Sequence, residues 1–411
     1  MARSFIHAAV DVGTTKVCTL VGQVGMGGDI EVTGVGIAPA RGLLKGMVVN
    51  IDEAAEAIRT SIQRAERTSG SRVVSAHVGI TGSHLSALNN RGTITITRSD
   101  RLVSEEDVSR VLEAARTTAG VPSNREIIHV VPRTYILDGQ EGVRNPVGLH
   151  GFRLDVETHI VMGAITSIQN LIKCVEQVGV QVENLVLEPL ASAEAVLTED
   201  ERETGVALVD VGGGTTDVAV FIQGSVGHTG VVPIGGNQFT QDLVIGLRAP
   251  FAAAEEAKIA YGSVEPSRIP SDEMMELSVF GAGGKRPISR RLMSEILRAR
   301  CEELLDLCHD VVRRSGYNGL LPAGLVFTGG AANLTGLAAL AEQLLYMPAR
   351  IGSPEGVSGL VDSVSSPAYA ASVGLLQWAA RYGAEDGRVR QPSSQLLAFF
   401  EGLLAWLRPR A

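Results

Sequence analysis

Two short segments of this sequence have the residue types needed to hold a phosphate chain. The first, DVGTTK, begins at Asp11, and the second, DVGGGTTD, begins at Asp210, about half the chain later. Each places an Asp at the end of an apolar, strand-like run and follows it with glycines and threonines. Glycine lets backbone N–H groups converge on an anion, and threonine hydroxyls add donors. Either segment alone fits an ordinary hairpin equally well, whereas the pair favours a nucleotide cleft.

We therefore predict that residues 13–16 (the first turn) and 212–216 (the second turn) hold the phosphates of one nucleotide from opposite sides. The predicted phosphate contacts are Gly13, Thr14, Thr15, Lys16, Gly212, Gly213, Gly214, Thr215 and Thr216. Asp11 and Asp210 would flank a Mg²⁺ ion through water, because Mg²⁺ gives up its hydration shell reluctantly. No GxxxxGK[ST] segment occurs, so the chain is not a P-loop protein.

The elements that must position these turns alternate between strands and helices. Short runs rich in Val, Ile and Ala at residues 5–12, 17–24 and 30–37 indicate a strand meander, and residues 52–67 have helical spacing. Residues 206–224 repeat the first strand, turn and strand. This order predicts α/β domains built on mixed sheets in both halves.

Residues 238–315 are expected to contain a broken helix, a loop-rich stretch and a long helix. Residues 238–261 indicate a helix that Pro250 should break near Arg248. Residues 262–287 are rich in loop-forming residues, and residues 289–315 indicate one long helix.

Composition excludes several classes of protein. At 411 residues the chain exceeds the roughly 250–300 residues of a single core, so two or more domains are expected. Hydrophobic residues make up 45% and charged residues 20%, which excludes a largely disordered chain. The formal charge of -9 lacks the positive surplus of a general nucleic-acid binder, so no nucleic-acid partner is expected. Four cysteines without a CxxC pair indicate core residues rather than a zinc site or disulfide framework.

No export signal or membrane span is expected. The N-terminal segment has neither an apolar h-region nor a small-residue cleavage site. No run reaches the roughly 18 consecutive apolar residues that would span a bilayer. We therefore expect a cytoplasmic protein.

The order of motifs resembles the actin, Hsp70 and sugar-kinase superfamily. Five segments match in the expected order: DVGTTK, EPLASAEAV, DVGGGTTD, FTGGAANLTGL and SPAYAASVGLL. More narrowly, the chain is similar to the bacterial cell-division family FtsA through EIIHVVPRTYILDGQEGVRNPVGLHGFRLDVETHIV, PIGGNQFTQDLVIGLRAP and ISRRLMSEILRARCEELLDL. This likeness covers nearly the whole chain and weakens only at residues 262–287 and in the linker after Tyr382.

The resemblance implies an actin-like, two-lobed α/β fold with duplicated ribonuclease-H-like domains, an FtsA-type inserted α+β subdomain and a C-terminal amphipathic helix. The implied units are subdomain 1A (1–83, 162–203 and 366–383), inserted subdomain 1C (84–161), subdomain 2A (204–248 and 314–365), subdomain 2B (249–313), a linker (384–392) and a membrane-targeting helix (393–411).

The resemblance also implies ATP and Mg²⁺ as ligands. The residues it assigns to the nucleoside are Glu255 and Lys258 at the ribose and adenine, Gly329, Gly330 and Ala331 along the purine, and Gly235, Gly236 and Asn237 below them. Glu188 matches the position that orients the attacking water in relatives, although it fits a helix-initiating carboxylate equally well. Nothing in these residues sets a hydrolysis rate, so we expect at most a weak ATPase rather than a metabolic enzyme.

The last segment, SSQLLAFFEGLLAWLRPRA, indicates an amphipathic helix that lies on a membrane. On a helix, one half of the circumference would carry Leu396, Leu397, Phe399, Phe400, Leu403, Leu404, Trp406 and Leu407. Arg408 lies on the other half, and with Arg410 it could face anionic lipid. Partial burial of the apolar residues could contribute about ten kcal/mol before ordering costs. The alternative is a helix folded back onto its own domain or onto a partner.

Together these features predict an ATP-binding actin-like protein of the FtsA family. By resemblance it would polymerise on the cytoplasmic face of the cell membrane as a peripheral protein at the division site. It would there tether the tubulin-like protein FtsZ, in the Z-ring, during septum formation. The C-terminal peptide of FtsZ would bind residues 249–313, where an acidic peptide could meet Arg290, Arg291, Arg298 and Arg300. A solvated basic helix face explains these arginines equally well.

Three other functions remain open. The first is a sugar or acid kinase of the same superfamily, which would need a substrate-binding Asp in the cleft and no membrane tail. The second is a PilM-like ATP-binding protein of pilus assembly, for which an amphipathic tail would be unexpected. The third is an MreB-like cell-shape filament, which is disfavoured because those proteins carry their extra subdomain elsewhere.

Overall fold

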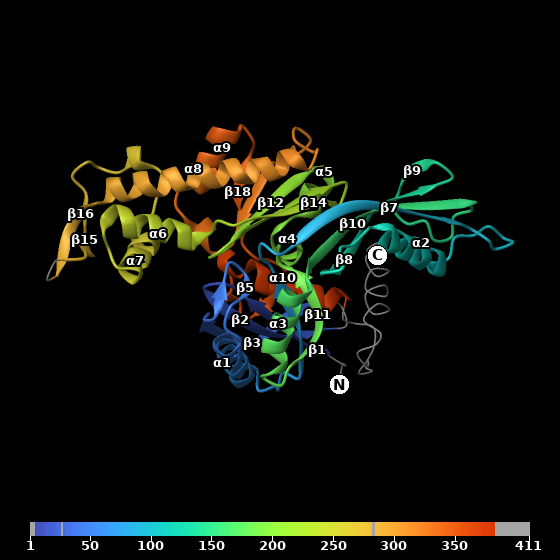
Figure 1. The fold of residues 1–411 in the computed structure, drawn as a ribbon, viewed down its shortest axis with the longest axis horizontal. Coiled ribbons are helices and arrows are strands. Elements are labelled where there is room, and N and C mark those ends of the chain that lie inside the picture. Colours follow the sequence, from blue (N-terminus) through green and yellow to red (C-terminus); the bar gives the residue numbers. More distant parts are fainter. Residues whose placement is uncertain (1–4, 26–27, 282–283, 383–411) are drawn as a thin grey trace.

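The first sheet forms the lower lobe in Figure 1, a computed structural model that describes residues 5–25, 28–281 and 284–382. Its strand order is β11-β6-β1-β2-β3-β19. The strands are β1 (Phe5–Val12), β2 (Lys16–Val24), β3 (Ile30–Pro39), β6 (Ser75–Ile80), β11 (Gln181–Leu187) and β19 (Ser358–Gly359). Strands β1 to β3 form an antiparallel meander, and β1, β6 and β11 run parallel to one another.

The second sheet repeats this topology with the order β14-β13-β12-β17-β18. Its strands are β12 (Val206–Val211), β13 (Thr216–Ile222), β14 (Ser225–Val232), β17 (Leu325–Thr328) and β18 (Ala349–Ile351). Again the first three strands form an antiparallel meander, and the last two continue in parallel from its first strand. The predicted pair of α/β domains on mixed sheets is therefore confirmed.

Two helices pack against each other between the sheets. They are α4 (Glu188–Val196), which precedes the second sheet, and α10 (Ala370–Tyr382). A Cβ atom on Gly374 would lie 1.8 Å from the carbonyl oxygen of Ala191, so only glycine allows this approach. The small residues Gly374 and Ala191 thus bring the backbones of α4 and α10 into contact.

A third sheet extends to the right of Figure 1 and has its own core. Its order is β7-β10-β8-β9, with β7 (Ser86–Thr95), β8 (Arg125–Leu137), β9 (Gln140–Val143) and β10 (Arg153–Ala164). Helix α2 (Glu105–Thr118) packs on it and begins with a capping box between Ser104 and Asp107. The core includes Leu112, Tyr135 and Leu154, all of which are buried.

The region left of the second sheet in Figure 1 is mainly helical. It contains α6 (Gly236–Leu247), α7 (Phe251–Tyr261), the hairpin β15 (Met274–Ser278) and β16 (Lys285–Ser289), and α8 (Arg290–Arg314). Arg248, with φ 53°, ends α6 just before Pro250, as predicted. The prediction of loops at 262–287 was wrong in part. A short hairpin forms there because Met275 and Leu277, two residues apart, are both buried.

The remaining elements connect the sheets or cover their outer faces. They are α1 (Ile51–Ser69), α3 (Ile165–Glu176), α5 (Glu199–Thr204), α9 (Leu337–Leu345), β4 (Leu43–Leu44), β5 (Met47–Val48), η1 (Pro266–Arg268), η2 (Gly330–Asn333), η3 (Val361–Ser363) and η4 (Pro367–Tyr369). No helix within the described ranges is both long and apolar enough to cross a membrane. The predicted linker and tail helix, residues 384–411, lie outside those ranges.

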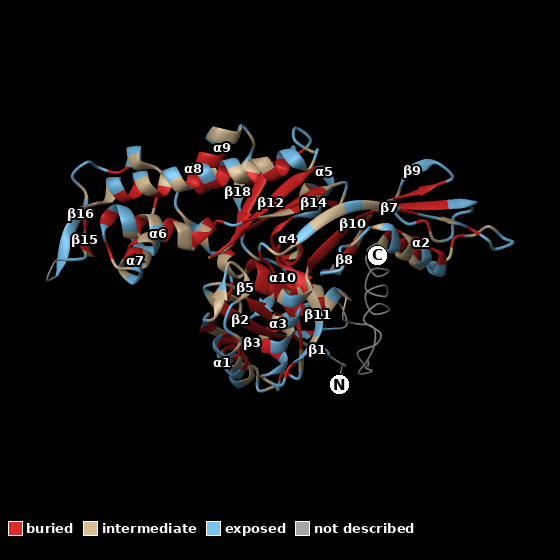
Figure 2. Ribbon diagram, viewed as in Figure 1, coloured by how far each residue is buried: buried red, intermediate tan, exposed pale blue. Residues whose placement is uncertain are grey.

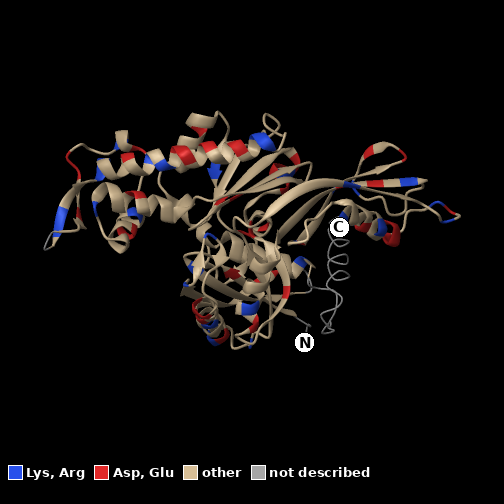
Figure 3. Cartoon of the chain, viewed as in Figure 1, with Lys and Arg blue, Asp and Glu red and all other residues tan. Residues whose placement is uncertain are grey.

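The buried acidic residues in the described part of the chain fall into two groups. Figure 2 shows that buried residues follow the sheets and α10, and Figure 3 shows that charged residues lie mostly on outer helices and loops. Two of the buried acidic residues have structural partners: Asp107 caps α2, and Asp155 pairs with Arg91 and Arg153. The other buried acidic residues are Asp11, Glu188, Asp210 and Asp217. Asp11, Asp210 and Asp217 raise the pKa of Glu188, Asp11 raises that of Asp210, and Asp210 raises that of Asp217, so the four form a single acidic cluster.

Candidate nucleotide site

Asp11 and Asp210 occupy equivalent places at the ends of β1 and β12. In the strand register, Asp11 lies opposite Cys18 and Asp210 lies opposite Asp217, one pair before each hairpin closes. The Ser372 hydroxyl of α10 donates to Asp11 Oδ2 at 2.6 Å. The Ser192 hydroxyl of α4 donates to Asp210 Oδ2 at 2.5 Å. Each of the two packed helices therefore orients one carboxylate.

The two predicted phosphate-binding turns lie in contact with each other. A Cβ on Gly213 would lie 2.4 Å from Thr15 Cγ2, and one on Gly214 would lie 2.8 Å from Thr14 Oγ1. A Cβ at either glycine would force the threonine side chains to move. The N–H groups of these four residues donate to no acceptor in the described part of the chain. The free N–H donors of the two turns therefore lie close together, as the binding of an anion requires.

Lys16 is held beside the first turn by residues of η4. Its ammonium donates to the carbonyl oxygen of Ala368 and lies 4.5 Å from the centroid of the Tyr369 ring. Its positive charge also lowers the pKa of Asp11, which burial raises more strongly. Lys16 therefore lies next to the acidic cluster, but its amine already has neighbours.

The N-terminus of α6 is attached to the second turn. The N–H groups of Gly236 and Asn237 donate to the carbonyl oxygens of Gly212 and Gly213, both at 2.8 Å. A Cβ on Gly235 would lie 2.7 Å from the carbonyl oxygen of Gly212. The predicted nucleoside residues of this segment thus adjoin the phosphate-binding segment directly.

Lys258 connects the predicted ribose and adenine residues. Its Nζ donates to the carbonyl oxygen of Gly236 at 2.9 Å and pairs with Glu255 Oε2 at 2.7 Å. A Cβ on Gly236 would lie 3.5 Å from both Lys258 Nζ and Ala331 Cβ. Residues from α6, α7 and η2 therefore meet at one end of the cleft.

Gly329 joins the predicted purine segment to the acidic cluster. Its φ of 87° is the left-handed conformation that favours glycine. A Cβ there would lie 2.3 Å from Asp210 Oδ1. Gly330 follows at the start of η2, so the end of β17 and the end of β12 lie side by side. The structure thus brings all the predicted nucleotide residues into one connected region.

The sequence analysis missed Thr81 and Asp217 as well as the two serines, Ser192 and Ser372. The Thr81 hydroxyl, at the end of β6, donates to Asp217 Oδ2 at 2.6 Å across the two sheets. Asp217 is the last residue of the segment DVGGGTTD, so its place in the motif was a signal that could have identified it. Thr81 had no comparable signal, because only the fold brings β6 and β13 together.

The carboxyl groups of the acidic cluster have raised pKa values. Burial is the main cause of each shift: it raises the pKa of Asp210 to about 6 and that of Asp217 to about 7. Burial and the neighbouring carboxyls raise the pKa of Glu188 well above its usual range. Glu188 Oε1 and Asp217 Oδ1 are buried without a hydrogen-bond partner among the described residues. These orphaned oxygens fit a site that a hydrated cation or water completes.

Direct ligation of a metal by protein side chains is not indicated. No group of three or more His, Cys, Asp or Glu residues in the described ranges converges enough to hold an ion. Asp11 and Asp210 each use one carboxylate oxygen for a serine. Their other oxygens leave contact through water open, so the predicted Mg²⁺ position stays a prediction.

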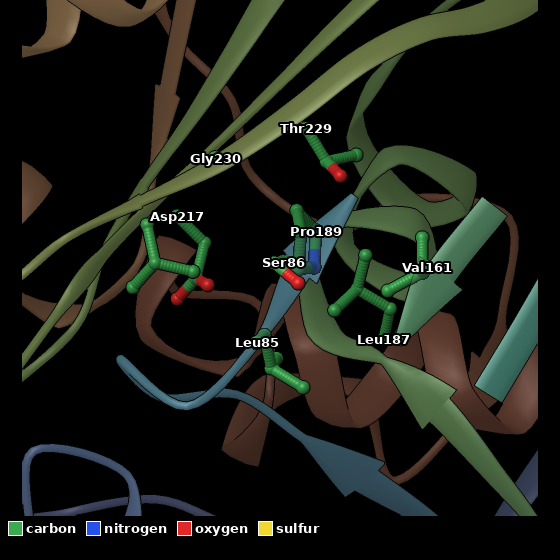
Figure 4. Close-up of a pocket in the computed structure, with 9 residues that line it drawn as sticks. Leu85, Ser86, Val161, Leu187, Pro189, Asp217, Thr229 and Gly230 are labelled. Carbon is green, nitrogen blue, oxygen red and sulfur yellow. The ribbon is translucent and has the colours of Figure 1, made fainter. Parts of the chain in front are cut away.

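A small pocket adjoins the cluster (Figure 4). Its lining consists of Leu85, Ser86, Val161, Leu187, Pro189, Asp217, Thr229, Gly230 and Val231. Figure 4 shows Asp217 on one side and Val161 and Leu187 on the other. Neither predicted phosphate-binding turn lines it, so this pocket is separate from the candidate nucleotide cleft.

The four arginines predicted to meet a partner peptide lie on α8, away from the cleft. Each has an intramolecular partner: Arg290 pairs with Glu273 at 2.6 Å, Arg298 with Glu302 at 2.8 Å and Arg300 with Asp242 at 2.5 Å, and Arg291 donates to the carbonyl oxygen of Ile269 at 2.7 Å. A partner peptide would have to compete with these contacts. Their role in binding stays a prediction.

Comparisons of the sequence identify closely similar proteins. The family model described as "Cell division protein FtsA" matches residues 207–374, and "SHS2 domain inserted in FTSA" matches residues 82–162. A cell division protein FtsA of Pseudomonas aeruginosa is 44% identical over 90% of this chain and 88% of its own length. Those of Neisseria meningitidis and Escherichia coli K12 are 39% and 35% identical, over 98% and 97% of this chain and 96% of each relative.

Solved structures share the fold at low sequence identity. The PilM-PilN type IV pilus biogenesis complex matches with a TM-score of 0.64 and 16% identity, over 92% of this chain and 99% of the other. MreB5 of Spiroplasma citri bound to ADP matches with a TM-score of 0.56 and 13% identity, over 93% and 99%. The expected actin-like fold is confirmed.

Proposed function

Because this chain belongs to the FtsA family of cell division proteins, we propose that it binds ATP between its two lobes, assembles with copies of itself and links FtsZ to the cytoplasmic membrane. ATP binding is the activity on which the others depend. The observation that carries it is the contact of Gly213 and Gly214 with the two threonines of the first turn. Free N–H donors and paired, serine-oriented carboxylates meet there.

In this proposal each residue of the cleft has a separate task. The turns bind phosphate oxygens through backbone N–H groups, and Lys258 and Ala331 border the nucleoside. Asp11 and Asp210 hold the hydration shell of the Mg²⁺ ion, which would neutralise phosphate charge when bound. Glu188, whose Oε1 has no partner among the described residues, would position a water molecule. The nucleotide-bound structures of the same fold support an adenine nucleotide as ligand.

ATP would favour the closed arrangement of the lobes and thereby assembly. A ligand that contacts both lobes stabilises the conformation in which they lie together. Copies assembled in a filament would then combine many weak membrane contacts into firm attachment. Residues 393–411 are proposed to supply each contact through their apolar helix face.

The proposed surface for FtsZ lies on the segment from α6 to α8. Large apolar side chains are exposed there, including Ile245 (68%), Ile259 (76%) and Phe280 (65%). We propose that these exposed apolar side chains contact the partner. Because the α8 arginines already have partners, the apolar residues are better placed to start the contact.

Co-sedimentation with anionic liposomes, with and without Mg-ATP and an FtsZ C-terminal peptide, tests the three activities together. We expect protein in the pellet, more of it with Mg-ATP, and peptide in the pellet only when protein is present. A pilus-assembly peptide of equal length serves as the control and should stay in the supernatant.

Asp210→Ala should lose at least a hundredfold in Mg-ATP affinity while staying folded. A variant that still binds normally would contradict the proposed cleft.

A further inference from the structure

A hairpin formed by residues 43–48 lies over both phosphate-binding turns. Its tip is Lys45–Gly46, between β4 and β5. The N–H of Gly46 donates to Thr14 Oγ1 of the first turn at 3.1 Å. A Cβ on Gly214 of the second turn would lie 3.0 Å from the Cα of Lys45. The tip therefore contacts one residue from each lobe where the turns meet.

Different residues of the second turn contact the hairpin tip and the start of α6. Gly212 and Gly213 bind the start of α6, which leads to Lys258 and Ala331. Gly214 instead contacts Thr14 and Lys45. A nucleotide whose base lies at the Lys258 end would extend its last phosphate toward Lys45.

The charges around the cleft leave Lys45 available for an anion. Four buried carboxyls surround the turns, and a triphosphate would add further negative charge. The amine of Lys16 donates to a carbonyl and contacts a ring, and Lys258 pairs with Glu255. The half-buried Lys45 makes no ion pair with any described residue.

The backbone of the tip is unusual for lysine. Lys45 has φ 49° and Gly46 has φ 74°, so both central residues of this two-residue hairpin are left-handed. Asn-Gly or Asp-Gly is the favoured pair in such a turn, and lysine there is strained by about 1 kcal/mol. A Cβ on Gly46 would lie 2.9 Å from Gly82 Cα, so close packing holds the tip in place. Strain of this kind concentrates at functional sites.

We propose that Lys45 binds the terminal phosphate of ATP and lets the hairpin distinguish ATP from ADP. This inference rests on the proposed ATP-binding function and adds a residue to it. The ammonium would lie against the phosphate that both turns hold. Loss of the terminal phosphate would leave the Lys45 ammonium without its partner and weaken the contacts of the hairpin with both lobes.

The test uses Lys45→Asn, because asparagine removes the charge while suiting a left-handed turn. Affinities for Mg-ATP, Mg-ADP and AMP are measured by calorimetry on the full chain. We expect a loss of about ten- to hundredfold for Mg-ATP, a smaller loss for Mg-ADP and none for AMP. Lys45→Arg should restore most of the Mg-ATP affinity, and thermal melting without nucleotide should show that Lys45→Asn is no less stable than the parent.

Lys285→Asn is the matched control, since Lys285 is an exposed lysine on β16 outside the cleft. It should bind all three nucleotides like the parent. The inference about Lys45, but not the proposed ATP binding, would be overturned by either of two results. One is that Lys45→Asn and the parent bind Mg-ATP equally well, and the other is that Lys45→Asn loses affinity equally for all three nucleotides. Failure of the parent to bind Mg-ATP would overturn the proposed function and this inference with it.

Discussion

The hydroxyl of Ser372 donates a 2.6 Å hydrogen bond to Asp11, although 361 positions separate the two residues. Ser192 makes the equivalent bond to Asp210 from the other packed helix. The two halves of the site therefore share one construction: a strand ends in an Asp, and a helix between the sheets supplies a serine that orients it. Any movement between α4 and α10 would change the relative placement of the two carboxylates.

Ser372→Ala and Ser192→Ala should each lower stability by a similar amount. Each removes a donor from a buried carboxylate, which costs about 1–3 kcal/mol of unfolding free energy. Urea denaturation measures the change. Ser109→Ala is the control, because the Ser109 hydroxyl bonds a helix carbonyl at the exposed surface of α2. A loss at Ser109 as large as at the two site serines would contradict a special role for these contacts.

Gly374→Ala should destabilise the protein by at least about 3 kcal/mol, through overpacking of the contact between α10 and α4. The added methyl would lie 1.8 Å from the carbonyl oxygen of Ala191, which is backbone and cannot rotate away. The midpoint of urea denaturation reports this effect. Gly284→Ala is the matched control, since a Cβ there meets nothing within 4 Å. Near-equal midpoints for the two variants would show that the helices can separate at little cost.

Without nucleotide, the contribution of Asp217 to stability should fall as the pH rises. Burial raises the folded-state pKa of Asp217 to about 7, whereas an unfolded Asp titrates near about 3.9. The folded protein therefore holds this proton more tightly than the unfolded chain, so the stabilisation is complete below about pH 4 and is lost toward pH 7. Asp210, with a pKa of about 6, acts in the same direction.

Asp217→Asn should make that pH dependence shallower. The amide cannot ionise and can still accept a hydrogen bond from Thr81. Urea denaturation at pH 5 and pH 8 should show that the variant loses less unfolding free energy than the parent, by about 1 kcal/mol or more. An unchanged difference between the two pH values would mean that Asp217 does not titrate in this range.

Removal of residues 393–411 should abolish binding to anionic liposomes and leave nucleotide affinity unchanged. The predicted apolar face would be lost, while the described lobes would stay intact. Co-sedimentation and calorimetry on the same preparation measure both properties. A truncated chain that pellets with liposomes as the parent does would show that another surface binds the membrane.

Local sequence determined several features of this protein without reference to the fold. The Asp, Gly and Thr residues of each turn are neighbours in the chain, so their motif is visible in a few letters. Pro250 ends a helix through its own ring and missing N–H, and the break at Arg248 follows from that. The repeat of the first strand pair near Asp210 predicted two related sheets for the same reason.

Only the tertiary structure decided which distant residues complete the site. Thr81 carries no local signal, and the sequence could not show that Ser192 and Ser372, which lie in the segments EPLASAEAV and SPAYAASVGLL, bond Asp210 and Asp11, because these roles depend on how distant elements pack. The pKa of Asp217 is likewise set by burial and by Asp210 across the hairpin rather than by its own chemistry. Local backbone preference shapes a turn, whereas hydrogen-bond partners and electrostatic environment arise only when β1, β12, α4 and α10 pack together.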